Sequence, residues 1–168
     1  GIVQEASTTI DAARLRAVAG NGIDLGSRSN RIGTVAAWAS AGDINLASTQ
    51  TLTVGSVTSR DDAVGTPGTT ANVEAEAGSV TLISDQDLRL EHSVIAGDAV
   101  LLQGQDIVVN PDGGGGTQSH SGFRAWVLAR TGTVALPTGD PVENVENSGS
   151  LTGHILAQGW PDTVPTQS

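Results

Sequence analysis

Apolar and polar residues alternate in three stretches of the chain that share one rhythm. The stretches are AGDINLASTQTLTV (41–54), AGSVTLISDQDLRL (77–90) and AGDAVLLQGQDIVV (96–109). Counted from the glycine of each stretch, aliphatic residues stand at offsets of 2, 4, 10 and 12, and a glutamine stands at an offset of 8. A period of two predicts strands with one buried face, so each stretch holds two short strands joined by a polar turn.

The residues at the four aliphatic offsets are expected to face the interior. They are Ile44, Leu46, Leu52 and Val54 in the first stretch, Val80, Leu82, Leu88 and Leu90 in the second, and Ala99, Leu101, Ile107 and Val109 in the third. A further strand is predicted before each repeat glycine, in TVAAWAS, ANVEAEA and HSVIA, and also in RAWVLAR before Gly132. Three short strands per coil and a step of 19 residues from Gly78 to Gly97 predict a parallel β-helix, an all-β solenoid whose coils stack about 4.8 Å apart.

Stacked coils bring equivalent turn residues into one column. The glutamines at the offset of 8 are Gln50, Gln86 and Gln105, and Asn30 in the segment SNRIGTV takes the equivalent place in an earlier, shortened coil. We expect each side-chain amide to bond to the amides above and below it. The alternative is that these residues are solvent-exposed turn residues without mutual contact.

Two steps between repeat glycines exceed one coil and indicate inserted loops. The steps are 36 and 35 residues long, and the excess falls on segments 59–72 and 110–123. Both segments follow the strand that ends at the offset of 12, so both should leave the solenoid at the same edge. Such loops either carry function or are tolerated surface decoration.

The whole chain, 1–168, is interpreted as a single β-helix domain with regular coils over 20–136. Segment 137–168 contains four prolines and is expected to be a degenerate coil, a cap or a linker. The early segment TTIDAARLRAVAG allows a helix from the spacing of Ile10, Ala13 and Ala17, but an irregular first coil is favoured.

Composition narrows the function. Of 168 residues 38% are apolar, and only three tryptophans and one phenylalanine are aromatic, so small aliphatic side chains must fill a narrow interior. Eight arginines against eighteen carboxylates give a net charge of −10, the wrong sign for a nucleic-acid or anionic-membrane surface, and both partners are excluded. The absence of cysteine removes disulfides and thiol chemistry.

Candidate catalytic and metal-binding residues are few. Asp87 and Asp106 stand one coil apart at the same offset and would bind a cation if they stacked, although solvated turn carboxylates are the favoured reading. The three histidines, His92, His120 and His154, share no metal-ligand spacing. No G-x-S-x-G motif occurs. We therefore expect no catalytic residue, no metal and no cofactor.

Outward-facing tryptophans form the candidate contact surface. In the strands before the repeat glycines, alternation places Trp38, Trp126 and Leu128 on the outer face. Large apolar side chains on such a face are covered by the inserted loops, contact another chain, or stack on a sugar ring.

The repeat resembles a known family. The segments SAGDINLAS, SNRIGTVAAW and TQTLTVGSV are similar to the coil pattern of filamentous-haemagglutinin-like exoproteins, the large secreted passengers of two-partner secretion. The resemblance covers about residues 20–136. It implies a right-handed β-helix, export through an outer-membrane β-barrel transporter, and an extracellular role in adhesion or as a fibre. It also suggests that the chain is an internal or processed segment of a larger protein.

These expectations lead to two hypotheses of function. The first is a non-catalytic, extracellular structural or adhesive β-helical module that contacts a host cell, a neighbouring cell or a glycan. Because the end rungs of a β-helix carry unpaired backbone groups, head-to-tail stacking into fibres is expected if neither end is capped. The second is a carbohydrate-binding or polysaccharide-cleaving β-helix that uses the tryptophan face.

Overall fold

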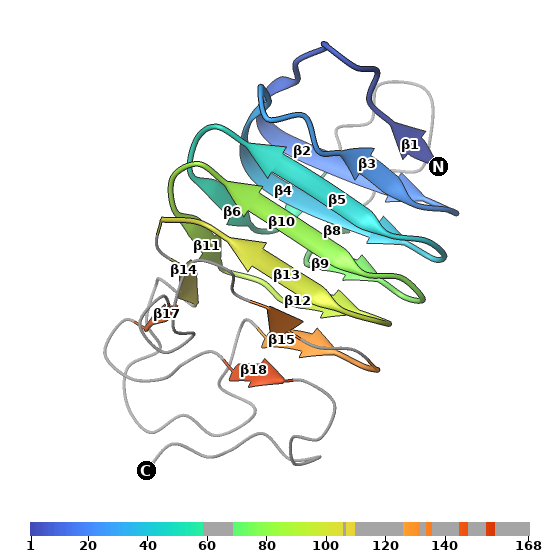
Figure 1. Ribbon diagram of the computed structural model, residues 1–168, viewed down its shortest axis with the longest axis vertical. Helices are drawn as coiled ribbons and strands as arrows, with labels where there is room; N and C mark the ends of the chain where they lie inside the picture. The colour runs from blue at the N-terminus through green and yellow to red at the C-terminus, as the bar shows by residue number, and fades with distance from the viewer. Residues whose placement is uncertain are drawn as a thin grey trace.

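A computed structural model describes most of the first two thirds of the chain and several strands beyond it. The described residues are 1–58, 69–105, 107–109, 126–131, 134–135, 145–147 and 154–156. All secondary-structure elements in these residues are β-strands, and no helix occurs among them. The fold of the described residues is therefore all-β, and its strands follow one another from the N-terminus along the longest axis of the molecule (Figure 1).

One sheet consists of six parallel strands, and their order across the sheet is the same as their order along the chain. They are β1 (Ile2–Val3), β3 (Ile23–Leu25), β5 (Ile44–Ser48), β10 (Val80–Ser84), β13 (Val100–Gln103) and β16 (Val134–Ala135). Between one strand of this sheet and the next, the chain passes through a second sheet. We call one such passage a circuit and each strand level a rung.

The second sheet also pairs its strands in parallel. It contains β2 (Asp11–Ala19), β4 (Arg31–Ala39), β6 (Leu52–Val54), β9 (Val73–Ala75), β11 (Leu88–Leu90), β12 (Val94–Ala96), β14 (Ile107–Val109), β15 (Trp126–Ala129), β17 (Val145–Asn147) and β18 (His154–Leu156). The first two circuits contribute one nine-residue strand each, and each later circuit contributes two short strands.

The long strand β4 spans the positions of both short strands of the next circuit, and its alternation changes phase near its start. Ile32 and Val35 are both buried, and the two residues between them are not, so the alternation restarts at Gly33 and Thr34. In the next circuit β6 pairs with Thr34 and Val35, and β9 pairs with residues Ala37 to Ala39, so the two short strands divide at Ala36. A Cβ at Gly33 would lie 2.8 Å from the Ala13 carbonyl oxygen, so the close approach of β2 and β4 here requires glycine.

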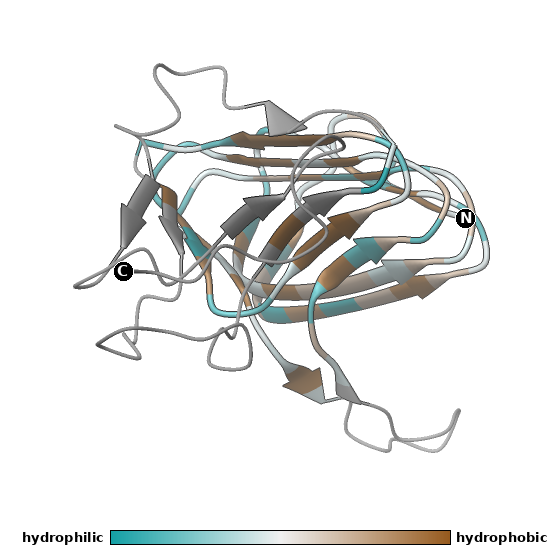
Figure 2. Cartoon of the chain, turned by 90° about the horizontal axis from the view of Figure 1, so that it is seen from below, coloured by the Kyte–Doolittle hydropathy of each residue, from teal (hydrophilic) through white to brown (hydrophobic). Residues whose placement is uncertain are grey.

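The interior consists of columns of aliphatic side chains. A column is a set of residues that pair in register from rung to rung. One column contains Ile2, Ile23, Ile44, Val80, Val100 and Val134. Ile23, Ile44, Val80 and Val100 are at most 1% exposed, and burial of each such side chain stabilises the fold by about 1.5–3 kcal/mol. Figure 2 shows the hydrophobic segments in the strands of successive circuits.

The expected register is confirmed in two repeats and is wrong in part of the third. Ile44 pairs with Val80 and Leu46 with Leu82, as the offsets predict. In the third repeat Val100 and Leu102 are buried, whereas the predicted Ala99 and Leu101 are partly exposed.

The cause of this error is the length of a turn. Three residues separate β12 from β13, but four separate β9 from β10. A Cβ at Gly97 would touch Glu76 and Ala77, so Gly97 does not lie over Gly78, the glycine with which it was aligned. The step between rungs of the first sheet is consequently 20 residues from Val80 to Val100 and 21 from Ile23 to Ile44, not a constant 19.

A small antiparallel hairpin begins two residues before the first inserted segment, 59–72, and its second strand lies within that segment. Its strands are β7 (Val57–Thr58) and β8 (Thr69–Thr70), and it follows β6 directly. The hairpin contacts β2 and β4, and the Arg16 Nε donates a hydrogen bond of 2.7 Å to the Thr70 hydroxyl. Residues 59–68, the whole second segment 110–123, and most of 137–168 lie outside the described residues.

Candidate interaction surfaces

Asn30 is fully buried at the turn between β3 and β4, and its side-chain amide is saturated with hydrogen bonds. The Oδ1 accepts from the Gln4 Nε2 at 2.7 Å and from the Ile10 N–H at 2.9 Å. The Nδ2 donates to the Gln4 Oε1 at 2.8 Å and to the Leu25 carbonyl at 2.9 Å. An amide offers two donors and two acceptor sites, so no bonding capacity remains here for a ligand.

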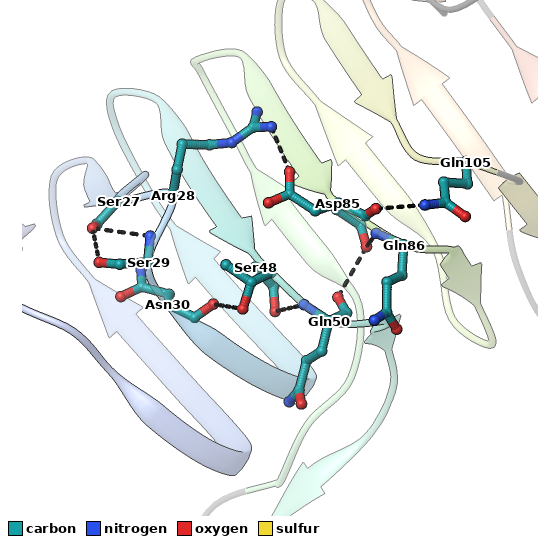
Figure 3. Close-up of polar contacts among 11 residues, drawn as sticks. Ser27, Arg28, Ser29, Asn30, Ser48, Gln50, Asp85, Gln86 and Gln105 are labelled. Carbon is teal, nitrogen blue, oxygen red and sulfur yellow. Dashed lines mark hydrogen bonds and ion pairs between the residues drawn. The ribbon is translucent and has the colours of Figure 1, made fainter.

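The three predicted column glutamines follow one another in successive turns, but their side chains bond elsewhere (Figure 3). The Gln86 Oε1 accepts from the backbone N–H and hydroxyl of Thr51, at 3.2 and 3.3 Å. The Gln105 Nε2 donates to the Asp85 carbonyl at 3.0 Å. Among the described residues no hydrogen bond joins the side-chain amides of Gln50, Gln86 and Gln105. The turn backbone has unpaired groups of its own, and the glutamines satisfy those instead.

Two buried serines make contacts that were not anticipated. The Ser48 hydroxyl donates to the Ile32 carbonyl and accepts from the Ile32 N–H, each at 3.0 Å. The Ser84 hydroxyl donates to the Gln50 carbonyl at 2.9 Å and accepts from the Gln86 N–H at 3.1 Å. Ser48 and Ser84 pair in register, so a hydroxyl joins neighbouring circuits at the same corner twice.

Two arginines bridge circuits that are not adjacent. Arg28 lies in the turn after β3 and pairs with Asp85 in the turn after β10, two circuits later (Figure 3). Arg130 pairs with Glu74 across one intervening rung, at 3.4 Å. Both pairs are substantially exposed, so each contributes no more than about 1 kcal/mol.

Trp38 is partly exposed on the outer face of β4. Its neighbours in the column are Val18, which is 42% exposed, and Glu74. The same column continues through Ile95 to Leu128. An indole beside a carboxylate combines an apolar face with hydrogen-bond acceptors, which suits a partner that has both apolar and hydroxyl groups.

The predicted surface residues do not all share one column. Trp38 and Leu128 do, whereas Trp126 pairs with His154 in a different column. The backbones of Trp126 and Leu128 lie in β15, and their side chains are outside the described part of the chain.

The inserted hairpin covers part of the outer face near Trp38. Ala36 is two residues before Trp38 on the same strand. Its neighbours Val35 and Ala37 are buried in the interior, so alternation places Ala36 on the outer face, yet Ala36 is also fully buried. Its partner in register on β2 is Arg16, which bonds to Thr70 of the hairpin. Val57 of the hairpin is 5% exposed. The hairpin and Arg16 therefore account for the burial of Ala36 and leave Trp38 partly accessible.

The described residues show no metal-binding arrangement at the candidate carboxylates and histidines. The Asp87 carbonyl accepts from the Leu52 N–H at 3.0 Å, and Asp106 and His120 lie outside the described residues. No group of three or more His, Asp or Glu side chains in the described ranges is arranged to hold a metal ion. Within the same ranges no helix has the length and apolar character needed to cross a membrane.

Comparison of the chain with protein-family models, curated proteins and solved structures gives no match.

Proposed function

We propose that the chain is a right-handed parallel β-helix and that it serves as an extracellular structural or adhesive module of a large secreted surface or fibre protein. The observation that carries this proposal is the continuity of the interior columns. The column that begins at Ile2 keeps its register through six rungs and reaches Val134. A stack of this kind is elongated by construction and presents the outer faces of its strands as a long lateral surface.

The buried polar groups support a structural role. Asn30, Ser48 and Ser84 are buried, and their side chains form hydrogen bonds with residues of neighbouring turns and rungs. A buried polar group stabilises a fold when its hydrogen bonds are satisfied, and such groups fix the register of the strands around them. We therefore assign them to holding the circuits together and assign no catalytic act to the chain.

The resemblance of the repeat to filamentous-haemagglutinin-like exoproteins supports the location. In this proposal the protein crosses the outer membrane through a β-barrel transporter and works at the cell surface. A chain without cysteine suits that route, because no disulfide has to form or be avoided during export.

A bead-adhesion experiment tests the proposal. Beads that carry the purified chain are passed over host or neighbour cells, and their retention under flow is compared with that of bare beads. We expect retention by the folded chain and its loss in Leu46→Asp, which places a carboxylate in the core where Leu46 is fully buried. Retention equal to that of bare beads would contradict an adhesive role.

A second candidate function is carbohydrate binding or polysaccharide cleavage on the outer face at Trp38. It rests on the partly exposed Trp38 next to Glu74 in one column. A glycan screen with wild type, Trp38→Ala and the control Trp38→Phe tests it, because phenylalanine keeps an aromatic face for stacking. Binding that is lost in Trp38→Ala and kept in Trp38→Phe supports the site. Release of new reducing ends from a polysaccharide would add cleavage, and equal binding by all three variants would exclude the site.

A further inference from the structure

The first and last rungs of the structure match each other column by column. The first rung consists of β1 and β2, and the last consists of β16, β17 and β18. β1 and β16 are the two edges of the first sheet. In the second sheet, among the strands that the structure describes, β2 pairs with β4 alone, and β17 and β18 end the sheet. Each edge strand thus pairs on one side only within the described residues, and a strand edge of this kind is a template for pairing with a further strand.

The exposed apolar residues lie on the first rung. Val3 is 74% exposed and Val18 is 42% exposed, and they are the large hydrophobic residues that stand out as exposed in the described part of the chain. The column of Val3 runs through Asp24, Asn45, Thr81 and Leu101 and ends at Ala135. The column of Val18 ends at Leu156. Each exposed valine therefore begins a column that an apolar residue ends.

A column with charged ends also pairs complementary residues on the first and last rungs. Arg14 is exposed on β2 and begins a column that passes through Thr34, Thr53, Arg89 and Val108 and ends at Glu146. The first residue of this column is a cation and the last is an anion. Residues of opposite charge on adjacent strands stabilise their pairing, and residues of like charge weaken it.

The sequence around the two ends is complementary in charge as well. Residues 1–31 contain four of the eight arginines and three carboxylates, and Arg14 and Arg16 are the two arginines on the first rung itself, whereas residues 132–168 contain four carboxylates and no arginine or lysine. In a chain with a net charge of −10, the start of the stack is the region where an acidic partner meets the least repulsion.

We propose that the first rung of one copy pairs with the last rung of a second copy, head to tail and in register. The proposal rests on the β-helical module proposed above and names its partner. β1 pairs with β16 of the second copy, which sets Val3 beside Ala135. β2 pairs with both β17 and β18, which sets Arg14 beside Glu146 and Val18 beside Leu156.

The structure contains a precedent for this joint. A single long strand, β4, already pairs with the two short strands β6 and β9 of the following circuit. β2 has the same length as β4 and pairs with it over nearly all of its residues, so β2 can pair with two short strands in the same way. The contact joins different surfaces of the two copies, and repetition of it gives an open filament instead of a closed dimer.

A charge-reversal experiment tests the register of the joint. The mass of the purified chain is measured by sedimentation over a concentration series for wild type, Arg14→Glu, Arg89→Glu and Arg14→Glu combined with Glu146→Arg. Arg89 is in the same column as Arg14 but on an inner rung, so it controls for the change of net charge. Circular dichroism checks that every variant remains folded.

We expect wild type to grow in mass with concentration and Arg14→Glu to weaken association by about tenfold, because it sets two carboxylates side by side. Arg89→Glu should change association by less than about twofold, and the exchanged pair should restore it. Wild type that stays at the mass of one chain throughout, or equal weakening by both single variants, would overturn the joint. Adhesion of such a monomeric chain in the bead experiment would leave the proposed function standing, so the two failures can be told apart.

Engineered cysteines provide a second readout in a chain that has none. Within one chain the two ends of a column are five strand spacings apart, roughly 24 Å, whereas at the joint they are one spacing apart, about 4.8 Å, which a disulfide can bridge. Oxidised Val18→Cys with Leu156→Cys should therefore form covalent multimers. The mismatched pair, Val18→Cys with Ala135→Cys, should not. Equal multimers from both pairs, or a product that stops at a dimer, would overturn the proposal.

Discussion

Asn30 and Gln4 exchange two side-chain hydrogen bonds, of 2.7 and 2.8 Å, although 26 residues separate them in the chain. Asn30 is fully buried and also bonds to the Ile10 N–H and the Leu25 carbonyl, so one side chain joins the segment before β2 to the turn between β3 and β4. Asn30, one member of the predicted amide column, therefore pairs with Gln4, which lies outside the repeat.

Asn30→Leu should destabilise the protein strongly. The substitution removes four hydrogen bonds and leaves the Ile10 N–H and the Leu25 carbonyl without their partner in a part-buried region. Leaving buried polar groups unpaired costs about 1–3 kcal/mol each, so we expect a loss of about 2–4 kcal/mol in the free energy of unfolding. Urea unfolding followed by circular dichroism measures it.

Asn21→Ala is the control for that experiment. Asn21 is exposed in the turn before β3, and its replacement should change the free energy of unfolding by less than about 0.5 kcal/mol. A loss in Asn30→Leu as small as in the control would mean that the buried amide network does not stabilise the first circuits.

Ser48→Ala should cost about 1–2 kcal/mol of stability. The Ser48 hydroxyl serves both the N–H and the carbonyl of Ile32, and alanine leaves both without this partner at a site where Ser48 is 1% exposed. Thermal unfolding of Ser48→Ala and Ser56→Ala provides the comparison, because Ser56 is exposed. Equal melting temperatures for the two variants would show that the buried hydroxyl contributes nothing.

Leu102→Ala and Leu101→Ala test the register of the third repeat. Leu102 is fully buried, so its truncation should cost about 2–5 kcal/mol, whereas Leu101 lies on the partly exposed face and should cost less than about 1.5 kcal/mol. The two variants remove the same atoms from adjacent positions on β13. A larger loss of stability in Leu101→Ala than in Leu102→Ala would instead support the register predicted from the repeat glycines, in which Leu101 faces the interior.

The strands that were predicted from the sequence are those with strict alternation. Ile44 and Leu46 alternate with Asn45, and Val80 and Leu82 alternate with Thr81, and the parallel pairing of Ile44 with Val80 follows from their equal offsets. The predicted register of β13 was wrong because the turn after β12 is one residue shorter than the turn after β9. The two turns have similar compositions, so the sequence pattern does not reveal the difference in length. β2 is a strand and not the alternative helix, since its pairing with β4 overrides a helical spacing of small residues.

The polar contacts were predictable only where the repeat shows them. Ser48 and Ser84 both stand six residues after their repeat glycine, so their equivalence is visible in the sequence. Gln4 belongs to no repeat, so its pairing with Asn30 required the three-dimensional structure. The side-chain bonds of Gln86 and Gln105 could not be assigned either, because glutamine reaches a backbone group of the next turn as easily as it reaches another amide.

Val57→Asp should release the hairpin from the outer face while the sheets stay folded. Val57 is 5% exposed in a strand that contacts β2 and β4, so a carboxylate there loses apolar burial and gains a desolvation cost, together about 2 kcal/mol or more. The hairpin is antiparallel and separate from both parallel sheets, and only its docking depends on Val57. Hydrogen exchange should therefore become faster at residues 57–58 and 69–70 and remain unchanged in β10 and β13.

Ser56→Asp is the matched control, because it adds the same charge at the exposed position next to Val57. It should leave exchange in the hairpin unchanged. Release of the hairpin should also uncover Ala36, two residues before Trp38, and so increase quenching of the Trp38 fluorescence relative to the control. The other two tryptophans have to be replaced by phenylalanine to make that signal specific. Unchanged exchange in Val57→Asp would mean that the Arg16 to Thr70 hydrogen bond is sufficient to hold the hairpin in place.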